Sequence, residues 1–124
     1  MVAIGEDLVG DKANAVLDMA RPSVALYVGG MGARDKNFYN TIMQKYGYVD
    51  EAIGIQDNYL SGEKDKAASL VPAEMLANTN LVGPASYVKE RIAAYKEAGV
   101  THLSVNPVGA DATATIEQLK ELLD

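Results

Sequence analysis

The stretch LVGPASYVKERIAAYKEAGVTHLSVNP, residues 81–107, decides the fold class of this chain. A glycine followed by a proline is typical of the start of a helix, and Gly99 is typical of its end. Three apolar side chains at helical spacing give this helix one inward face, namely Val88, Ile92 and Tyr95. Residues 101–107 are predicted to form a strand, with Leu103 and Val105 on the same face. Helix and strand joined by a short turn indicate an α/β protein.

The residues after this stretch predict one more helix and require a second strand. Asp111 is placed to cap a final helix whose inward residues are predicted to be Ile116, Leu119 and Leu123. A single strand cannot satisfy its backbone hydrogen bonds alone, so the unit needs a parallel neighbour. Residues 2–4, VAI, are the candidate for a further short strand.

The middle of the chain predicts helices with little sign of strand. Apolar residues from Ala13 to Tyr27 recur at helical spacing, and Pro22 is expected to kink that helix or divide it in two. The segment SVALYV within it also reads as a buried strand, although we favour a helix. Asp35 or Asn37 is placed to cap the next helix, which carries Phe38, Ile42 and Tyr46 on one side. Further short helices are predicted at residues 50–62, 64–71 and 72–78.

Composition excludes several classes of function. The chain has 124 residues and a net charge of −6, with no basic patch, which disfavours nucleic acid and anionic membranes as partners. It has no cysteine and a single histidine, His102, so thiolate and multi-histidine metal sites are excluded. We therefore expect no metal site. The chain has no secretory signal pattern and no apolar run of membrane length, so we expect a cytoplasmic protein.

The predicted elements are too few for a closed fold. One confident strand and one or two doubtful ones do not make a complete barrel of eight strand–helix units, which takes ~250 residues. We therefore expect residues 1–124 to be a single partial domain of a larger α/β enzyme. Its parts would be a helical insertion at about residues 11–80 and a terminal helix–strand–helix unit at about residues 81–124.

Several segments resemble one family of enzymes. ALYVGGMGARDKNFYN, KYGYVDEA and IQDNYLSG, followed by the stretch at residues 81–107, are similar to the closing third of luciferase-like oxidoreductases. The most similar branch uses the deazaflavin coenzyme F420, with FMN as the alternative cofactor. The resemblance implies a (β/α)8 TIM-type barrel that moves a hydride between this cofactor and a small-molecule substrate. It also implies that this chain is the helix-rich C-terminal portion of that barrel and does not retain the cofactor alone, because earlier strands make most contacts to the cofactor's ring.

The glycine-rich run YVGGMGARDK supplies the first candidate site residues. The amides of Gly30 and Gly32 and the guanidinium of Arg34 could meet an anionic group of the cofactor or substrate. The alternative is a helix end followed by a tight turn, with Arg34 a surface residue paired with Asp35 or Glu6. The run does not match the dinucleotide or phosphate-loop patterns.

Tyr39 and Asn40 are the second pair of candidates. A pocket of apolar side chains with a few polar groups suits a substrate, and in the resembled family this segment borders the mouth of the barrel. The alternative is that the aromatic residues of the middle helices serve core or interface packing. These are Phe38, Tyr39, Tyr46, Tyr48 and Tyr59. We interpret His102 as a histidine at a strand start that bonds to neighbouring backbone.

Two functions therefore remain open from the sequence. The leading hypothesis is a segment of an F420- or flavin-dependent oxidoreductase whose catalytic residues are unknown. The alternative is a non-enzymatic helical module that associates with itself or a partner through its aromatic helices. In either case we expect a homo-oligomer or completion by the missing portion of the barrel.

Overall fold

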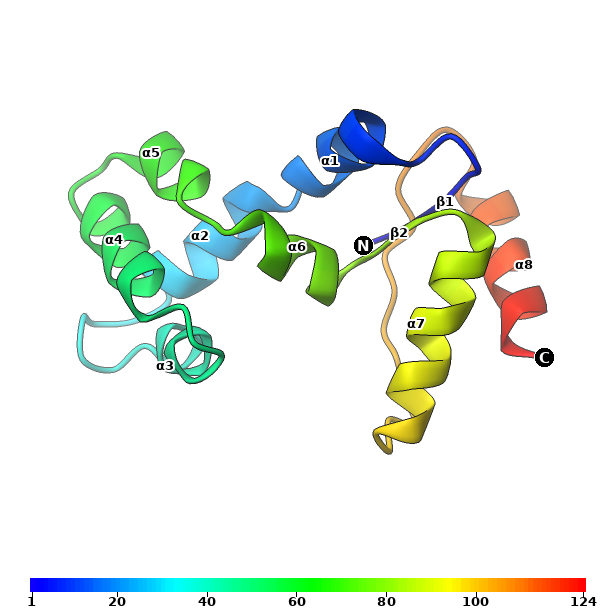
Figure 1. Ribbon diagram of the computed structural model, residues 1–124. Helices are drawn as coiled ribbons and strands as arrows, with labels where there is room; N and C mark the ends of the chain where they lie inside the picture. Colours follow the sequence, from blue (N-terminus) through cyan, green and yellow to red (C-terminus); the bar gives the residue numbers. More distant parts are fainter. The chain divides into compact units, whose positions relative to one another are not determined.

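The chain is mixed α/β and rich in helix, as the sequence predicts. The computed structural model describes residues 1–124 and contains two strands and eight helices (Figure 1). The strands are β1 (Val2–Ile4) and β2 (Leu81–Gly83). The helices are α1 (Gly10–Asp18), α2 (Arg21–Gly30), α3 (Phe38–Lys45), α4 (Val49–Leu60), α5 (Lys64–Ser69), α6 (Ala73–Thr79), α7 (Ala85–Glu97) and α8 (Ala112–Leu123). None of them combines the length and hydrophobicity that a membrane crossing requires.

The residues form two compact units. The sheet unit consists of Met1–Leu17 and Ala77–Asp124, and the helical unit consists of Asp18–Leu76. The helical unit falls within the insertion predicted at about residues 11–80. That residues 1–124 are a single partial domain stays a prediction.

The sheet unit is built on two parallel strands. Val2 of β1 pairs with Leu81 of β2, and Ile4 pairs with Gly83. Helix α7 packs on β2, and α8 packs on β1 and α7 (Figure 1). The core between these elements consists of Val2, Leu81, Val88, Ile92 and Leu119. Sequence patterns do not reveal β2, because three residues are too few to show the alternation of a strand.

The strand predicted at residues 101–107 does not form. This segment meets β1 at one isolated bridge between Val2 and Pro107, where the Val2 N–H donates to the Asn106 carbonyl at 2.9 Å. No other residue of this segment pairs with β1 or β2. Leu103 and Val105 accordingly stay 45% and 37% exposed.

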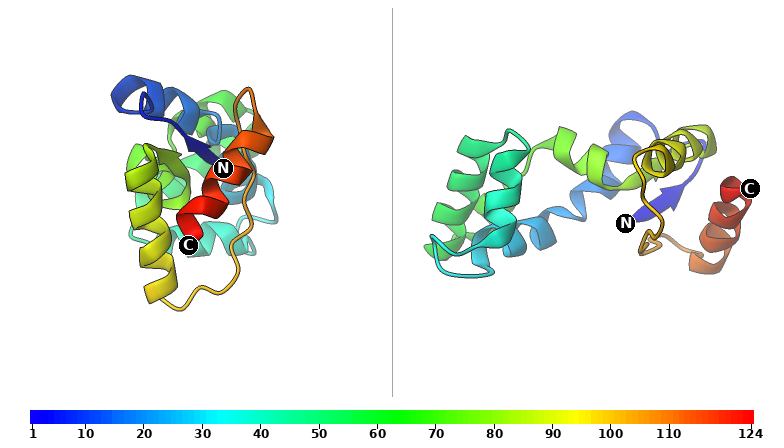
Figure 2. Two further views of the ribbon diagram at one scale, coloured as in Figure 1. Left: turned by 90° about the vertical axis from the view of Figure 1, so that its right-hand side faces the viewer. Right: turned by 90° about the horizontal axis from the view of Figure 1, so that it is seen from below.

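The helices confirm most of the predicted boundaries. Helices α1 and α2 are separate, with Pro22 in the first turn of α2, and the segment SVALYV is helical rather than a strand. Helix α2 packs against α3, α4 and α5, and α3 also packs against α4 (Figure 2). Asn37 caps α3, and Asp111 caps α8 in the sheet unit, each by accepting a backbone hydrogen bond from the third residue beyond it.

The predicted row of residues along one side of α3 lies at the surface, and the predicted inward face of α8 is wrong in part. Helix α3 buries Asn40 and Met43, which leaves Phe38 and Tyr46 exposed at 68% and 64%. The reason is that Asn40 bonds to carbonyls of α2 and α4, and this contact turns the aromatic face away from the core. In α8 Leu119 is buried as predicted, whereas Ile116 and Leu123 are exposed.

Candidate functional site

The five predicted site residues all lie in the helical unit. Gly30 ends α2, Gly32 and Arg34 belong to the loop that follows, and Tyr39 and Asn40 lie in the first turn of α3. Figure 1 shows this loop as the cyan segment between α2 and α3. The five residues therefore lie in one continuous segment, from the end of α2 to the first turn of α3. The contacts of each residue indicate its role.

Asn37 and Asn40 form a buried polar junction between three helices. Asn37 donates from Nδ2 to the carbonyls of Tyr27 and Val28, each at 3.0 Å. Its Oδ1 accepts from the Asn40 N–H at 3.0 Å, which caps α3. Because the last carbonyls of a helix lack intrahelical partners, the two bonds from Asn37 satisfy the C-terminal end of α2. Asn37 was anticipated only as a cap, and its link to α2 has no local sequence signal.

Asn40 completes this junction. Its Nδ2 donates to the Val28 carbonyl at 3.0 Å and the Ala52 carbonyl at 2.9 Å, and its Oδ1 accepts from Gln44 Nε2 at 2.7 Å. Both amide hydrogens are therefore bonded within the protein, and the residue is buried. The arrangement connects α3 to α2 and α4 and leaves no donor of this side chain for a ligand.

Glycine at the end of α2 allows close approach to α4. A Cβ added at Gly29 would lie 2.5 Å from the Cβ of Tyr59, and one added at Gly30 would lie 2.5 Å from the Cε1 of that tyrosine. Both distances are far below van der Waals contact. Gly29 and Gly30 are thus positions of helix–helix packing.

Gly32 makes the turn after α2. Its φ of 143° lies in the region that favours glycine, and an added Cβ would lie 2.8 Å from the Lys36 carbonyl oxygen. These contacts agree with the turn interpretation of the glycine run. A role of Gly30 or Gly32 toward a ligand stays a prediction.

Arg34 pairs with an acidic residue of α4. Its Nη1 donates to Asp57 Oδ1, and its carbonyl accepts from Gln56 Nε2 at 3.0 Å. The side chains of Arg34 and Asp57 are both more than half exposed. The partners proposed from the sequence were Asp35 and Glu6. The sequence gives no signal for Asp57, because the contact joins residues 23 positions apart.

Truncation of Arg34 should barely change stability. Because an exposed ion pair contributes ~0.2–1 kcal/mol, Arg34→Ala should lower the free energy of unfolding by less than ~1 kcal/mol in chemical denaturation. Lys12→Ala, which removes the exposed pair with Asp7, is the matched control. A loss of several kcal/mol for Arg34→Ala alone would show that this pair holds the loop in place.

Tyr39 is accessible and belongs to an aromatic cluster. Its ring lies edge-on to Tyr27, with centroids 4.9 Å apart, and to Phe38 at 5.8 Å. All three rings are exposed. Tyr39 is thus the predicted pocket residue whose side chain remains free to meet another molecule.

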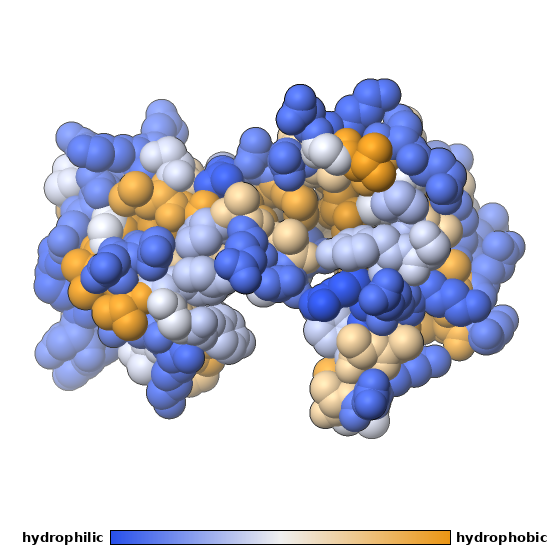
Figure 3. All heavy atoms as spheres, in the orientation of Figure 1, coloured by the Kyte–Doolittle hydropathy of each residue, from blue (hydrophilic) through white to orange (hydrophobic).

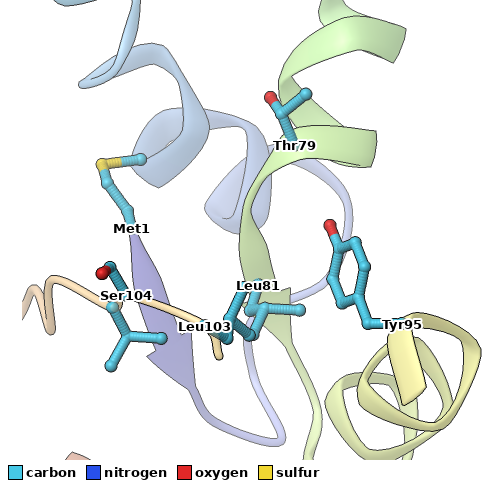
Figure 4. A pocket seen from close by; sticks show the side chains of 7 residues that line it. Met1, Thr79, Leu81, Tyr95, Leu103 and Ser104 are labelled. Atoms are coloured by element: carbon cyan, nitrogen blue, oxygen red, sulfur yellow. The ribbon is translucent and has the colours of Figure 1, made fainter. Parts of the chain in front are cut away.

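The sheet unit contains a small cavity beside β2. Leu81, Tyr95 and Leu103 line it together with Met1, Thr79, Ser104 and Val105 (Figure 4). Its volume is about 40 Å³, whereas pockets for drug-sized ligands measure ~300–1,000 Å³. His102 lies near by in sequence but is exposed, and its Nδ1 is 3.2 Å from the Thr101 hydroxyl. No group of three histidine or acidic side chains is arranged to hold a metal ion.

Comparison with known proteins identifies the family of this chain. Residues 4–102 match the model of the luciferase-like monooxygenase family, so the chain belongs to this family. It is 30% identical over 117 residues to a protein of Mycobacterium tuberculosis that is provisionally named a coenzyme F420-dependent oxidoreductase. The match covers 94% of this chain and 34% of that protein, so the chain spans about a third of its relative's length. No solved structure matches the chain significantly.

Proposed function

We propose that this chain is part of an F420-dependent oxidoreductase that transfers a hydride between the deazaflavin and a small organic substrate. The family match over residues 4–102 carries the proposal, and the provisional name of the relative favours F420 over FMN. In such enzymes the cofactor supplies the hydride chemistry, and the protein positions the substrate against it.

The parallel strands and the flanking helices support a role as the C-terminal portion of a TIM-type barrel. Strands β1 and β2 are parallel, and the next helix, α7, packs back on β2. A strand followed by a helix that covers it is the repeating unit of a (β/α)8 barrel. The chain would then supply part of the barrel wall, and the helical unit would be its insertion.

The small cavity beside β2 does not accommodate a tricyclic cofactor. The cavity beside β2 has a volume of about 40 Å³. At the other candidate position Arg34 is paired with Asp57, and the donors of Asn40 are bonded to backbone. We therefore assign no catalytic step to these side chains. Binding of F420 or FMN would require the rest of the longer polypeptide.

Native mass spectrometry of the purified chain tests this division of roles. We expect no stoichiometric complex when F420 or FMN is added to residues 1–124. The same residues joined to the other two-thirds of the M. tuberculosis relative should bind F420. Tight binding by the short chain would show a more complete site than we describe. Failure of the joined protein to bind either cofactor, despite a folded spectrum, would contradict the oxidoreductase proposal.

One observation favours the alternative, a helical interaction module. Aromatic side chains that were expected to serve core or interface packing are exposed on α3. These exposed aromatic side chains do not depend on a cofactor. An enzyme can also have them, so they do not exclude the oxidoreductase proposal.

A further inference from the structure

The outer edge of β2 has no neighbouring strand in the sheet unit. The Leu81 N–H donates to the Met1 carbonyl at 2.9 Å. The Gly83 carbonyl accepts from the Gly5 N–H at 3.1 Å, so Leu81 and Gly83 both turn their backbone groups toward β1. Because successive residues of a strand direct these groups to opposite sides, the N–H and the carbonyl of Val82 point away from β1. The sheet has two strands and Val82 is 6% exposed, so a buried residue has two backbone groups that no strand satisfies.

The other edge of the sheet, beside β1, is occupied by residues 106–108. The Val2 N–H donates to the Asn106 carbonyl at 2.9 Å, and the Val108 N–H donates to the Val2 carbonyl at 3.0 Å. The residue between them is Pro107, which has no N–H to offer to a further strand. Residues 106–108 therefore end the sheet on this side, and the edge of β2 is the one at which a strand can add.

The structure favours residues 101–105 of the same chain as the occupant of this edge. They follow α7, and the strand that follows such a helix usually returns beside the strand before it. The parallel bridge between Pro107 and Val2 shows that this part of the chain already runs in the direction of the sheet. None of residues 101–105 makes a backbone–backbone hydrogen bond, so no such bond within the segment is lost on pairing. The segment is therefore correctly directed and free to pair.

The apolar residues of this segment fit one register against β2. In this register Ser104 lies beside Val82. Leu103 then lies beside Leu81, which belongs to the core covered by α7. The two leucines already line the same small cavity, which this pairing would fill (Figure 4). Because side chains alternate along a strand, Val105 shares the face of Leu103.

Pairing in this register buries side chains that are now at the surface. Figure 3 shows apolar side chains exposed between charged ones on one face of the molecule. Leu103 and Val105 are 45% and 37% exposed in the observed position. On a third strand both would join the core face of the sheet, so the hydrophobic effect favours pairing.

We infer that residues 103–105 close on the free edge of β2 as a third parallel strand, and that the bridge of residues 106–108 to β1 holds them open. The two positions exclude each other, because the two edges lie on opposite sides of the sheet. Closure gives Val82 its partners and takes them from Val2, which is 0% exposed. The closed form is therefore the minor one until another strand covers β1. The inference concerns the sheet unit alone and does not rest on the oxidoreductase proposal.

Pairs of introduced cysteines test closure, because the chain contains no cysteine. Val82→Cys/Ser104→Cys should form an intramolecular disulfide under mild oxidation, since neighbouring strands lie ~4.8 Å apart and a disulfide joins Cα atoms at ~4.4–6.8 Å. Val82→Cys/Leu103→Cys and Val82→Cys/Val105→Cys are the matched controls. Their second cysteine would point to the opposite face of the closed strand, so their disulfides should form at least about tenfold more slowly. Mass spectrometry of the oxidised chains measures the three rates.

Weakening the bridge to β1 should promote closure. Val108→Pro removes the N–H that donates to the Val2 carbonyl, whereas Val108→Ala keeps it and is the matched control. Val108→Pro should raise the rate of the cross-link between positions 82 and 104 several-fold. In the chain without cysteines it should also slow hydrogen exchange of the Val82 amide, which gains a partner on closure. This second measurement requires no substitution in β2.

Three results would overturn the inference. The first is equal cross-linking of position 82 to positions 103, 104 and 105, which indicates a loop that touches β2 without pairing. The second is the absence of a disulfide between positions 82 and 104 in a chain whose circular dichroism spectrum is unchanged. The third is unchanged or faster exchange of the Val82 amide in Val108→Pro, because release from β1 would then give this amide no partner.

Discussion

Replacing Asn40 with alanine should lower the free energy of unfolding of the helical unit by about 1–3 kcal/mol. The substitution removes the donors to the Val28 and Ala52 carbonyls and the acceptor of Gln44. The Val28 carbonyl keeps the hydrogen bond from Asn37, so the loss comes mainly from the bonds to the Ala52 carbonyl and Gln44. Each hydrogen bond of this kind contributes ~0.5–1.5 kcal/mol. Chemical denaturation followed by tyrosine circular dichroism would measure the loss.

Two further variants separate the hydrogen bonds from other effects. Asn40→Asp keeps the shape and removes both donors, so it should destabilise the unit at least as much as alanine does. Asn14→Ala changes an exposed asparagine of α1 and should alter stability by less than ~0.5 kcal/mol. If Asn40→Ala matched Asn14→Ala, the buried junction would not stabilise the fold, and a role toward a ligand would explain the residue better.

Local patterns predict the helices of this chain well. Caps at Asn37 and Asp111, the division at Pro22 and the inward positions of α7 all depend on neighbours within a few residues. Strands depend on distant partners. Residues 81–83 become β2 because they meet residues 2–4, whereas residues 101–105 have a suitable pattern and lack a ladder.

The candidate site shows the same limit. The glycine-rich run and its neighbours identify the right region, but the roles come from long-range contacts. Tyr59, 29 positions after Gly30, is the reason for a glycine there. From the sequence alone, Asn40 is a candidate polar group of a pocket. In the structure its side chain instead donates to carbonyls of α2 and α4. The exposure of Phe38 and Tyr46 follows from these bonds and has no separate signal.

Replacing Gly29 with alanine should destabilise the helical unit by roughly 1–3 kcal/mol, the usual cost of overpacking a core. The added methyl group would lie 2.5 Å from the Tyr59 Cβ and 3.2 Å from the Ile55 carbonyl oxygen. Both atoms are fixed to the backbone of α4, so the two helices must separate. This effect exceeds the ~0.5–1 kcal/mol that alanine contributes through helix propensity. Gly54→Ala is the control, since its methyl group would meet a single movable atom of Leu70 at 3.3 Å.

The Tyr59→Ala background distinguishes the two packing glycines. At Gly30 the added methyl group would meet Cε1 of the Tyr59 ring, which this substitution removes, so Gly30→Ala should become harmless in that background. At Gly29 the obstacle is the Tyr59 Cβ, which alanine retains, so Gly29→Ala should stay destabilising. Double-mutant cycles from denaturation curves measure both couplings. In the Tyr59→Ala background, Gly30→Ala should lose its destabilising effect and Gly29→Ala should keep it. A general loosening of α2 would affect both substitutions alike, so it cannot explain this difference. Equal couplings at the two positions would contradict the close packing of α2 on α4.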